Sequence, residues 1–330
     1  MSTVTCITVT YGQRRAMLEE VIQALISQSI DHIVVVDNGA TWPVKSTLER
    51  AYAGLVTVLE MTRNLGSAAG YAAGLRHAET LDSDFVLLLD DDNKPEQDCL
   101  SRLKSTFLQI ESTSDGPLAV LAFRPEHQTE ITEGENQRLG PRINSFRGFH
   151  IIDIPKKLLG RVITKPAPDK LPERVMMEIA PYSGLFFRKD LIFQIGTPRA
   201  DFVLYADDSE FTYRINASGG QIVLVTSAKV KDLESSWNTR GSTRASSFSI
   251  ILNQGSDLRA YYGTRNGVYF GYHCRPKSRV LSWINRAIYL ALLRLHAMRT
   301  GRVDRYRLVR QAVKDGLNKQ LGEHRDFPLR

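Results

Sequence analysis

The sequence is poor in cysteine and has no long hydrophobic run. Its three cysteines, Cys6, Cys99 and Cys274, lie far apart and form no CxxC pair, which argues against a zinc ribbon or a disulfide framework and indicates a reducing compartment. The first ten residues have no basic segment, and polar residues interrupt the apolar ones, so we expect no secretory signal. No stretch of about 18 uninterrupted apolar residues occurs, so we expect no membrane-spanning helix. These absences predict a cytoplasmic protein.

The composition is that of a folded chain with a basic end. Of the 330 residues, 42% are hydrophobic and 24% are charged, which suits one large or two modest domains. The formal net charge of +7 is uneven, because Arg and Lys crowd residues 275–330. A basic end indicates an anionic partner, such as nucleic acid, an acidic membrane surface or a phosphorylated lipid. The alternative is a solvated basic face without a partner.

Strand and helix patterns alternate through the first half of the chain. Apolar runs separated by amphipathic segments predict an α/β fold with a mostly parallel sheet, covered by helices on both faces. We expect strands at residues 4–10, 32–36, 56–59, 85–89 and 118–123, with helices at residues 15–28, 68–81 and 96–110. A further strand is expected later in the chain, at residues 221–225.

Polar residues follow several of these predicted strands. The second strand is expected to end at a turn signal, Asp37-Asn38-Gly39. In open parallel sheets, ligands bind beyond the carboxyl ends of the strands. We therefore expect Thr10, Asp37, Asn64 and the run Asp90-Asp91-Asp92 to surround one crevice.

Three consecutive carboxylates come directly after the fourth predicted strand. It costs free energy to place the carboxylates of Asp90, Asp91 and Asp92 beside one another unless a positive charge balances them. A divalent cation that prefers oxygen ligands, Mg²⁺ or Mn²⁺, supplies that charge. Alternate residues of an extended segment face the same way, so Asp90 and Asp92 are predicted to share one ion while Asp91 takes another role. The alternative is an acidic cluster that complements the start of the next helix.

Two further segments have both a chemical and a structural interpretation. Asp207 and Asp208 form a second acidic cluster, in which a carboxylate can act as general base toward an acceptor hydroxyl. The alternative is a cap on a helix at residues 209–218. Residues 64–70 join a strand to a helix through small residues that favour an anionic group, although tight helix packing explains them equally well. They match neither a Walker A loop nor a GxGxxG fingerprint.

Taken in order, these motifs resemble those of the family 2 glycosyltransferases, which have the GT-A fold. The resemblance extends over residues 3–320, with residues 125–175 unmatched. The later motifs are similar in particular to those of the galactofuranosyl- and rhamnosyltransferase branch. The matching segments are residues 9–14, 35–39, 64–70, 88–93, 182–186, 206–214, 261–266 and 312–317.

The resemblance implies roles for the matching residues. Asp90 and Asp92 would bind the metal, Mn²⁺ or Mg²⁺, that holds the donor diphosphate, and Asp208 would be the catalytic base. Asp207, Trp237 and Arg265 are candidates for the acceptor side, although a lone Trp is as often a packing residue. The residues that would bind a UDP- or dTDP-linked sugar donor are Thr10, Arg14, Asp37, Asn64, Gly66 and Asp91.

The sequence departs from the resemblance at one metal ligand. This branch usually has a histidine there, whereas this chain has Asp232. A carboxylate is a suitable oxygen ligand for Mg²⁺ or Mn²⁺. In the alternative, the three consecutive aspartates hold the metal alone, and Asp232 pairs with Lys229 or Lys231.

The resemblance also implies a domain organisation. Residues 1–255 would form the GT-A catalytic domain, in which the polar, Pro- and Gly-rich residues 125–175 make an irregular excursion that serves as a lid or an acceptor loop. Residues 256–330 would form a basic helical region. Within it, residues 278–299 place apolar side chains on one helix face, flanked by arginines. That face would either lie on the inner leaflet of the cytoplasmic membrane or pack on the catalytic domain or a second subunit.

The implied activity is inverting transfer of a sugar, with galactofuranose favoured, from a nucleotide-diphosphate donor to a glycan acceptor. In that branch the glycan is commonly lipid-linked and belongs to bacterial surface polysaccharide synthesis. A dTDP-rhamnosyltransferase is the alternative among enzymes, and a catalytically silent scaffold with the same fold is the alternative of another class. We expect no nucleic acid partner, because the sequence shows no helix-turn-helix, RRM or aromatic-interleaved basic groove.

Overall fold

The computed structural model describes residues 2–132, 139–154, 170–234, 247–275 and 278–329. Its strands form one mixed sheet: β1 (Val4–Gly12), β2 (His32–Ala40), β3 (Val56–Glu60), β4 (Phe85–Asp90), β5 (Asn93–Pro95), β6 (Leu118–Phe123), β7 (Arg174–Met177), β8 (Leu185–Arg188) and β9 (Gln221–Asp232).

The sheet is mostly parallel, as the alternating pattern predicts. Its order is β3-β2-β1-β4-β8-β6-β9-β5, with β7 beside β9. Strands β1 to β4 pair in parallel, whereas β8 lies antiparallel between β4 and β6. Strands β6 and β9 are again parallel, and the short β5 and β7 pair antiparallel with β9. The carboxyl ends of β1, β2 and β4 therefore meet at one edge.

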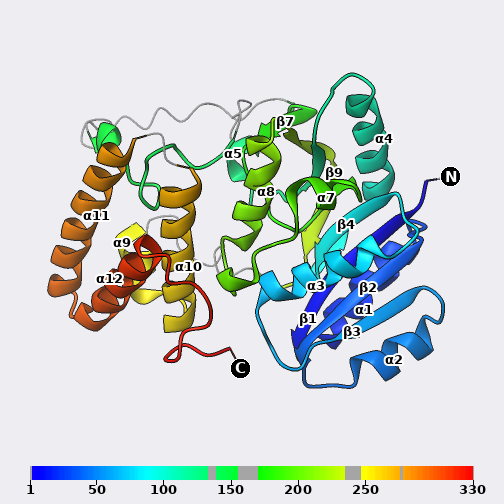
Figure 1. The fold of residues 1–330 in the computed structure, drawn as a ribbon, viewed down its shortest axis with the longest axis horizontal. Helices are drawn as coiled ribbons and strands as arrows, with labels where there is room; N and C mark the ends of the chain where they lie inside the picture. The colour runs from blue at the N-terminus through cyan, green and yellow to red at the C-terminus, as the bar shows by residue number, and fades with distance from the viewer. Residues whose placement is uncertain (1, 133–138, 155–169, 235–246, 276–277, 330) are drawn as a thin grey trace.

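Helices cover both faces of this sheet and extend beyond it (Figure 1). They are α1 (Arg15–Ile26), α2 (Val44–Ala51), α3 (Ser67–Glu79), α4 (Cys99–Glu111), α5 (Thr129–Thr132), α7 (Leu191–Ile195), α8 (Asp207–Ala217), α9 (Ser247–Asn253), α10 (Asp257–Tyr269), α11 (Arg279–Arg299) and α12 (Val303–Leu317), with short helical turns η1 (Ile151–Asp153), η2 (Ala200–Phe202) and η3 (Phe270–Cys274).

Alternation along the strands divides the sheet's core into two layers. Cys6 of β1 packs in one layer with residues of α1, α2 and α4. The next residue, Ile7, packs in the other layer with residues of α3, α7 and α8. Both layers are fully buried, which explains why the parallel strands have continuous apolar sequences rather than a polar face.

Several element boundaries differ from the sequence prediction, and those of β2, α4 and β9 are explained by strand pairing. Strand β2 does not end at Asp37 but continues to Ala40, because β1 also continues and pairs Gly12 with Ala40. Gly39 permits this continuation with a φ of +85°. Helix α4 begins at Cys99 rather than at residue 96, since Asn93–Pro95 pairs with β9 first. Strand β9 runs seven residues past its predicted end at residue 225, because its later part pairs with β5.

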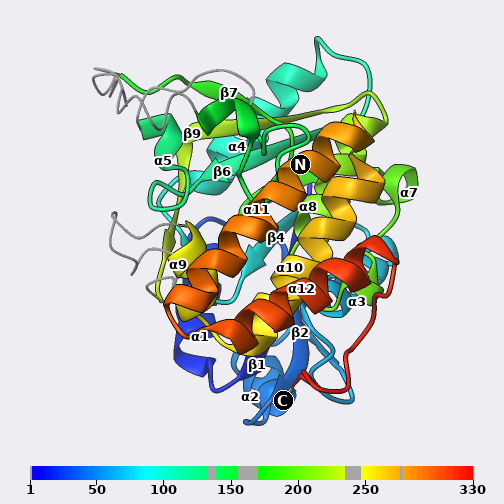
Figure 2. The ribbon, with the colours of Figure 1, turned by 90° about the vertical axis from the view of Figure 1, so that its left-hand side faces the viewer.

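The C-terminal helices form a separate apolar cluster beside α8 (Figure 1). Tyr289 and Leu293 of α11 pack there against Val309 and Val313 of α12, and Phe146 from the irregular excursion joins them. Figure 2 shows α11 crossing this group on its outer side. Among the described residues, no helix is long and apolar enough to span a bilayer.

Candidate functional site

The predicted carboxylates meet the end of β1 at the carboxyl edge of the sheet. The Thr10 hydroxyl donates to Asp91 Oδ2 over 2.7 Å. Arg14, which precedes α1, bridges two of the aspartates, with Nε 2.8 Å from Asp91 Oδ1 and Nη2 2.6 Å from Asp92 Oδ2. Its remaining nitrogen reaches Glu234 Oε2 at 2.8 Å. Arg14 is therefore the counter-ion of this cluster, a contact that the sequence did not predict.

Asp90 and Asp92 remain partly exposed on either side of the buried Asp91. Asp90 accepts a hydrogen bond from the Tyr71 hydroxyl at 2.7 Å. Burial raises the pKa of Asp92, and repulsion from Asp90 raises it further, while Arg14 opposes both. Two repelling carboxylates that supply only oxygen atoms fit a hard divalent cation. The chemistry of these two carboxylates therefore suits the predicted metal, whereas the described residues contain no group of three or more His, Cys, Asp or Glu side chains arranged to hold one.

The second strand and the segment after β3 form a rigid corner next to this cluster. Asp37 Oδ1 accepts from the amide of Ala40 at 2.8 Å, and Asn38 Nδ2 donates to Asn64 Oδ1 at 3.2 Å. The Asn38 side chain also accepts from the amide of Leu65 at 2.9 Å. These bonds hold Asn64 against Asn38 and order the end of β2, which carries Asp37, so both predicted donor residues belong to the same edge of the sheet.

Gly66 lies where this corner touches the segment before α8. Its φ is +88°, and a Cβ there would lie 1.9 Å from the carbonyl oxygen of Val203. Glycine is therefore required at this position both for its backbone conformation and for close approach. The contact joins the start of α3 to the segment that carries the second acidic cluster.

The second cluster begins α8, but neither aspartate caps the helix. The N-cap residue is Ala206, in a left-handed conformation. Asp207 accepts from the Ser67 hydroxyl at 3.0 Å, and Asp208 accepts from the Ser209 amide at 2.6 Å. Burial raises the pKa of both carboxyls; Asp208 adds to the effect on Asp207, and Asp90 adds to that on Asp208. A raised pKa suits a general base that works near neutral pH.

The segment just before α8, which leads to these aspartates, has a strained backbone. Val203, Tyr205 and Ala206 all have positive φ, which is rare for residues with a side chain and unfavourable for a β-branched one. Val203 is the centre of a γ-turn, closed by a 2.8 Å bond from the Leu204 amide to the Phe202 carbonyl.

Asn266 of α10 holds this strained segment in place. Its Nδ2 lies 2.7, 2.8 and 3.0 Å from the carbonyl oxygens of Phe202, Leu204 and Tyr205. Arg265, predicted on the acceptor side, is 1% exposed and donates to the Phe202 carbonyl at 3.2 Å. The described contacts of Arg265 are with other protein groups, so we assign it the role of holding the strained segment at residues 203–206 in place.

Asp232, the predicted substitute ligand, lies at the end of β9 beside Asp92. The Leu233 amide donates to the Asp92 carbonyl at 2.8 Å, and Asn93 Nδ2 donates to Asp232 Oδ1 at 2.6 Å. Its carboxylate pairs with Arg124 and His127, both at 2.6 Å, rather than with Lys229 or Lys231. Burial raises the pKa of Asp232, but hydrogen bonds and charge from His127 and Arg124 outweigh it, so the net shift is downward.

Sequence reasoning missed several residues that the fold brings to this edge. Arg124 and His127 follow β6, and Glu234 follows β9, so only the pairing of these strands places them near Asp92. Tyr71 and Ser67 come from α3; residues 64–70 were expected either to favour an anionic group or to pack tightly, and neither of these two side chains was assigned a role. Trp237, predicted near the acceptor, lies outside the described residues.

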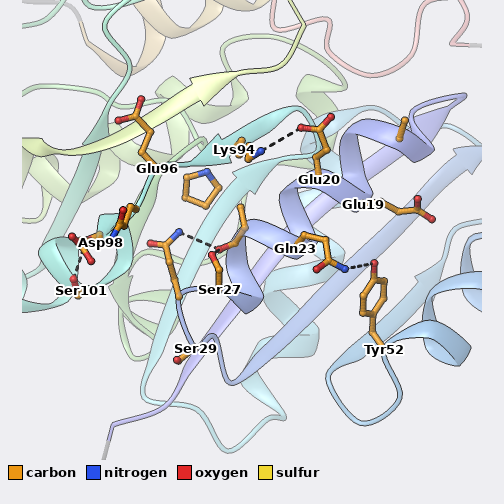
Figure 3. A pocket seen from close by; sticks show the side chains of 15 residues that line it. Glu19, Glu20, Gln23, Ser27, Ser29, Tyr52, Lys94, Glu96, Asp98 and Ser101 are labelled. Carbon is orange, nitrogen blue, oxygen red and sulfur yellow. Dashed lines mark hydrogen bonds and ion pairs between the residues drawn. The ribbon is translucent and has the colours of Figure 1, made fainter.

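A separate hollow of about 1170 Å³ lies away from these carboxylates, between α1, β5 and the start of α4 (Figure 3). It contains none of the predicted site residues. Figure 3 shows Lys94 paired with Glu20, and Gln23 bonded to Tyr52. Its other charged residues are acidic, namely Glu19, Glu96 and Asp98, so it does not suit an anionic ligand.

Comparisons with known proteins agree with this geometry. Galactofuranosyltransferase GlfT1 of Mycolicibacterium smegmatis is 28% identical over 222 residues, 66% of this chain and 66% of that protein. The protein of that name in Mycobacterium tuberculosis is 25% identical over 193 residues, 57% of this chain and 56% of that protein. The match thus spans just under two thirds of the length of the Mycolicibacterium smegmatis protein and just over half of the length of the Mycobacterium tuberculosis protein.

A solved structure supports the fold. The crystal structure of GalNAc-T7 with UDP, GalNAc and Mn²⁺ superposes with a TM-score of 0.53 at 13% identity, over 90% of this chain and 54% of that chain. It matches a mixed α/β architecture with a mostly parallel central sheet, which is the predicted GT-A fold. The sequence model of the family described as "Glycosyl transferase family 2" matches residues 5–171, half of the chain. The chain therefore belongs to glycosyl transferase family 2.

Proposed function

We propose that this protein transfers a sugar from a nucleotide-diphosphate donor to a glycan acceptor, with inversion at the anomeric carbon and with a divalent metal. The observation that carries the proposal is the convergence of Asp90 and Asp92 with Asp208, three carboxylates from two distant parts of the chain. Asp90 is near enough to Asp208 to raise its pKa. The names of the two relatives favour galactofuranose as the sugar.

The donor side of the proposed site is the corner formed by β1, β2 and α3. Thr10, Asp37 and Asn64 would contact the nucleoside and sugar, and Gly66 leaves room for close approach. Mn²⁺ or Mg²⁺ held by Asp90, Asp92 and Asp232 would act as a Lewis acid on the donor diphosphate. Arg14 balances the charge of Asp91 and Asp92 and so keeps the carboxylates together.

Asp208 performs the acid–base step in this proposal. The acceptor hydroxyl oxygen attacks the anomeric carbon, and its proton passes to the Asp208 carboxylate. The bond between the anomeric carbon and the diphosphate oxygen breaks, and the nucleoside diphosphate leaves with the electron pair. The Ser209 amide, 2.6 Å from Asp208 Oδ1, holds the carboxylate in one orientation for this transfer.

The test is calorimetric titration of UDP and of dTDP into the protein, with Mn²⁺, with Mg²⁺ and with EDTA. Metal-dependent binding of UDP supports the galactofuranosyl proposal, and metal-dependent binding of dTDP selects a rhamnosyl donor instead. Failure of both nucleotides to bind under every condition contradicts the proposal and favours a catalytically silent scaffold. Asp232→Asn should weaken metal-dependent UDP binding; unchanged binding would remove Asp232 from the metal site.

The acceptor and the cellular location are part of the same proposal. Helix α11 has arginines and no acidic residue, and its outer face exposes Val280, Trp283, Leu295 and Met298. A face of this kind suits the surface of an anionic bilayer. We therefore place the protein peripherally on the inner face of the cytoplasmic membrane, where it would extend a lipid-linked glycan for surface polysaccharide. A second copy of this chain is the competing occupant of the face.

A further inference from the structure

A cavity of about 440 Å³ opens beside the proposed catalytic base. Its walls come from the start of α8, from α9, from α10 and η3, from α11, from Ile179 and from residues 141–148. Ser209 is one of the lining residues, and the hydroxyl of Ser209 also donates to Asp208 Oδ1 at 3.2 Å. The cavity therefore begins one residue from Asp208.

One wall of the cavity is bare backbone. Gly263, Gly267 and Gly271 recur every four residues along α10 and η3, so they share one helix face. A Cβ at Gly267 or Gly271 would meet no atom of the described residues within 4 Å. Each glycine in a helix costs about 1 kcal/mol relative to alanine, and protein packing does not explain that cost here because the space is open. The open face lets a ligand lie directly along the helix.

Two arginines on the cavity wall have no counter-charge in the part of the chain that the structure describes. Arg286 of α11 is half-buried, and its guanidinium lies 5.7 Å from the centre of the Tyr272 ring. Arg147 donates to the Thr264 hydroxyl at 3.2 Å, but it forms no ion pair with a described carboxylate. Arg275, the third arginine on the wall, is already paired with Glu178. Guanidinium groups placed in this way bind phosphate well.

The rest of the lining combines apolar side chains with hydroxyl groups. Phe146, Val268 and Phe270 are apolar, whereas Ser145, Ser247 and Ser282 carry hydroxyls. Tyr289 of α11 is fully buried, and its hydroxyl lies beside Arg147. A cavity with both kinds of surface suits a ligand that is partly apolar and partly polar.

We propose that this cavity is the acceptor site and that Arg286 and Arg147 select an acceptor that carries a phosphate group. The apolar part of the acceptor lies along the glycine face of α10, its phosphate is bound by the two arginines, and its hydroxyl end reaches Asp208. The role of this cavity as an acceptor site rests on the proposed function. The binding of a phosphate-bearing ligand in the cavity does not depend on it.

The experiment titrates geranyl phosphate into the full chain by calorimetry, without nucleotide or metal, with geraniol and inorganic phosphate in separate titrations. We expect geranyl phosphate to bind more tightly than either fragment. Arg286→Gln should weaken its binding by about tenfold or more, because a charged hydrogen bond is lost. Gly267→Leu should weaken it by filling the cavity. The matched control is Arg294→Gln, which removes an exposed arginine of the same helix outside the cavity and should leave binding unchanged.

The outcomes separate this inference from the proposed function. Failure of geranyl phosphate to bind, equal binding of inorganic phosphate, or an equal loss in Arg294→Gln would overturn the inference. Titration of UDP with Mn²⁺ into Arg286→Gln is the second readout, and it should match the wild type, because Arg286 lies outside the donor corner and retained binding shows that the variant is folded. If the wild type binds geranyl phosphate but no nucleotide, the cavity assignment stands and the proposed transfer fails.

Discussion

At the residue scale, Asp207 and Asp208 are neighbours with different surroundings. Asp207 is buried against Ser67 of α3, whereas Asp208 is partly exposed, and its neighbour Ser209 lines the cavity beside α10. Burial raises the pKa of each. Its partial exposure makes Asp208 the better candidate for the base, and the buried Asp207 the better candidate for positioning.

Replacement of Asp208 tests its role as the base. Asp208→Asn removes the proton acceptor while keeping the shape of the side chain, so we expect turnover to fall by about 10²–10⁴. Nucleotide affinity should stay close to the wild-type value, because the donor contacts remain. Steady-state kinetics and calorimetry measure the two effects, with Asp304→Asn as the control, since Asp304 is a fully solvated aspartate on α12. Loss of nucleotide binding with normal single-turnover chemistry would disprove the assignment.

Asp207 gives a pH-dependent signature in stability. Its folded-state pKa is raised by burial and by Asp208, so protonation favours the folded state. The stabilisation is complete below the ordinary Asp pKa of about 4 and is lost as pH rises through the raised value. Asp207→Asn has no charge to bury. Its unfolding free energy relative to wild type should therefore rise between pH 4 and pH 8, as measured by urea unfolding in EDTA; a difference independent of pH would contradict the burial argument.

At the element scale, the contact between α10 and the segment before α8 is the one that positions the proposed base. Val203, Tyr205 and Ala206 hold conformations that are unfavourable in isolation, and strain of this kind persists only where the surroundings fix it. Asn266 supplies the three bonds that do so. The motif at residues 261–266 therefore helps to position the proposed base, Asp208, although the two are distant in the sequence.

Asn266→Ala should lower both stability and turnover. The carbonyls of Leu204 and Tyr205 lose this donor, whereas the Phe202 carbonyl keeps its bonds from Arg265 and from the Leu204 amide. Each unsatisfied group costs roughly 1–3 kcal/mol when water does not replace the donor. We expect a clear drop in the urea midpoint and a larger fall in kcat than in nucleotide affinity, because the donor corner is untouched. Asn253→Ala, at an exposed position on α9, is the control. A variant that loses stability but retains kcat would show that Asn266 is merely structural.

At the scale of the whole molecule, arginines and lysines are concentrated in the C-terminal part of the chain. Helices α10 to α12 pack beside α8 (Figures 1 and 2). Their outer helix α11 exposes 58% of Trp283 and 52% of Leu295. The cavity lies on the inner side of the same helix. A molecule bound to a membrane through α11 would thus keep the cavity at the surface that supplies a lipid-linked acceptor.

Vesicle binding tests this orientation. In a Trp42→Phe, Trp237→Phe variant, fluorescence reports Trp283 alone. We expect a blue shift with phosphatidylglycerol vesicles, a much smaller one with phosphatidylcholine, and a decrease with salt because charge attraction is screened. Leu295→Ser should reduce co-sedimentation, whereas Phe193→Ser, at an exposed phenylalanine on α7, should not. A shift that depends on protein concentration and ignores the lipid would assign the face to a second copy of this chain.

The sequence by itself determined the α/β alternation, the mostly parallel sheet and the edge where the site lies. These follow from local patterns, because apolar runs and the residues just after them are contiguous in the chain. The three consecutive aspartates after β4 were visible for the same reason. The ends of β2 and β9 were not, because pairing with β1 and β5 extended them.

Only the tertiary structure decided which side chains meet. Arg14 pairs with Asp91 across 77 residues, Asp232 pairs with Arg124 across 108, and Asn266 reaches carbonyls more than 60 residues away. Such contacts depend on strand order and helix packing, and no local pattern encodes them. The cavity beside Asp208 is of the same kind, since the segments that line it are distant in sequence and are brought together only by the fold.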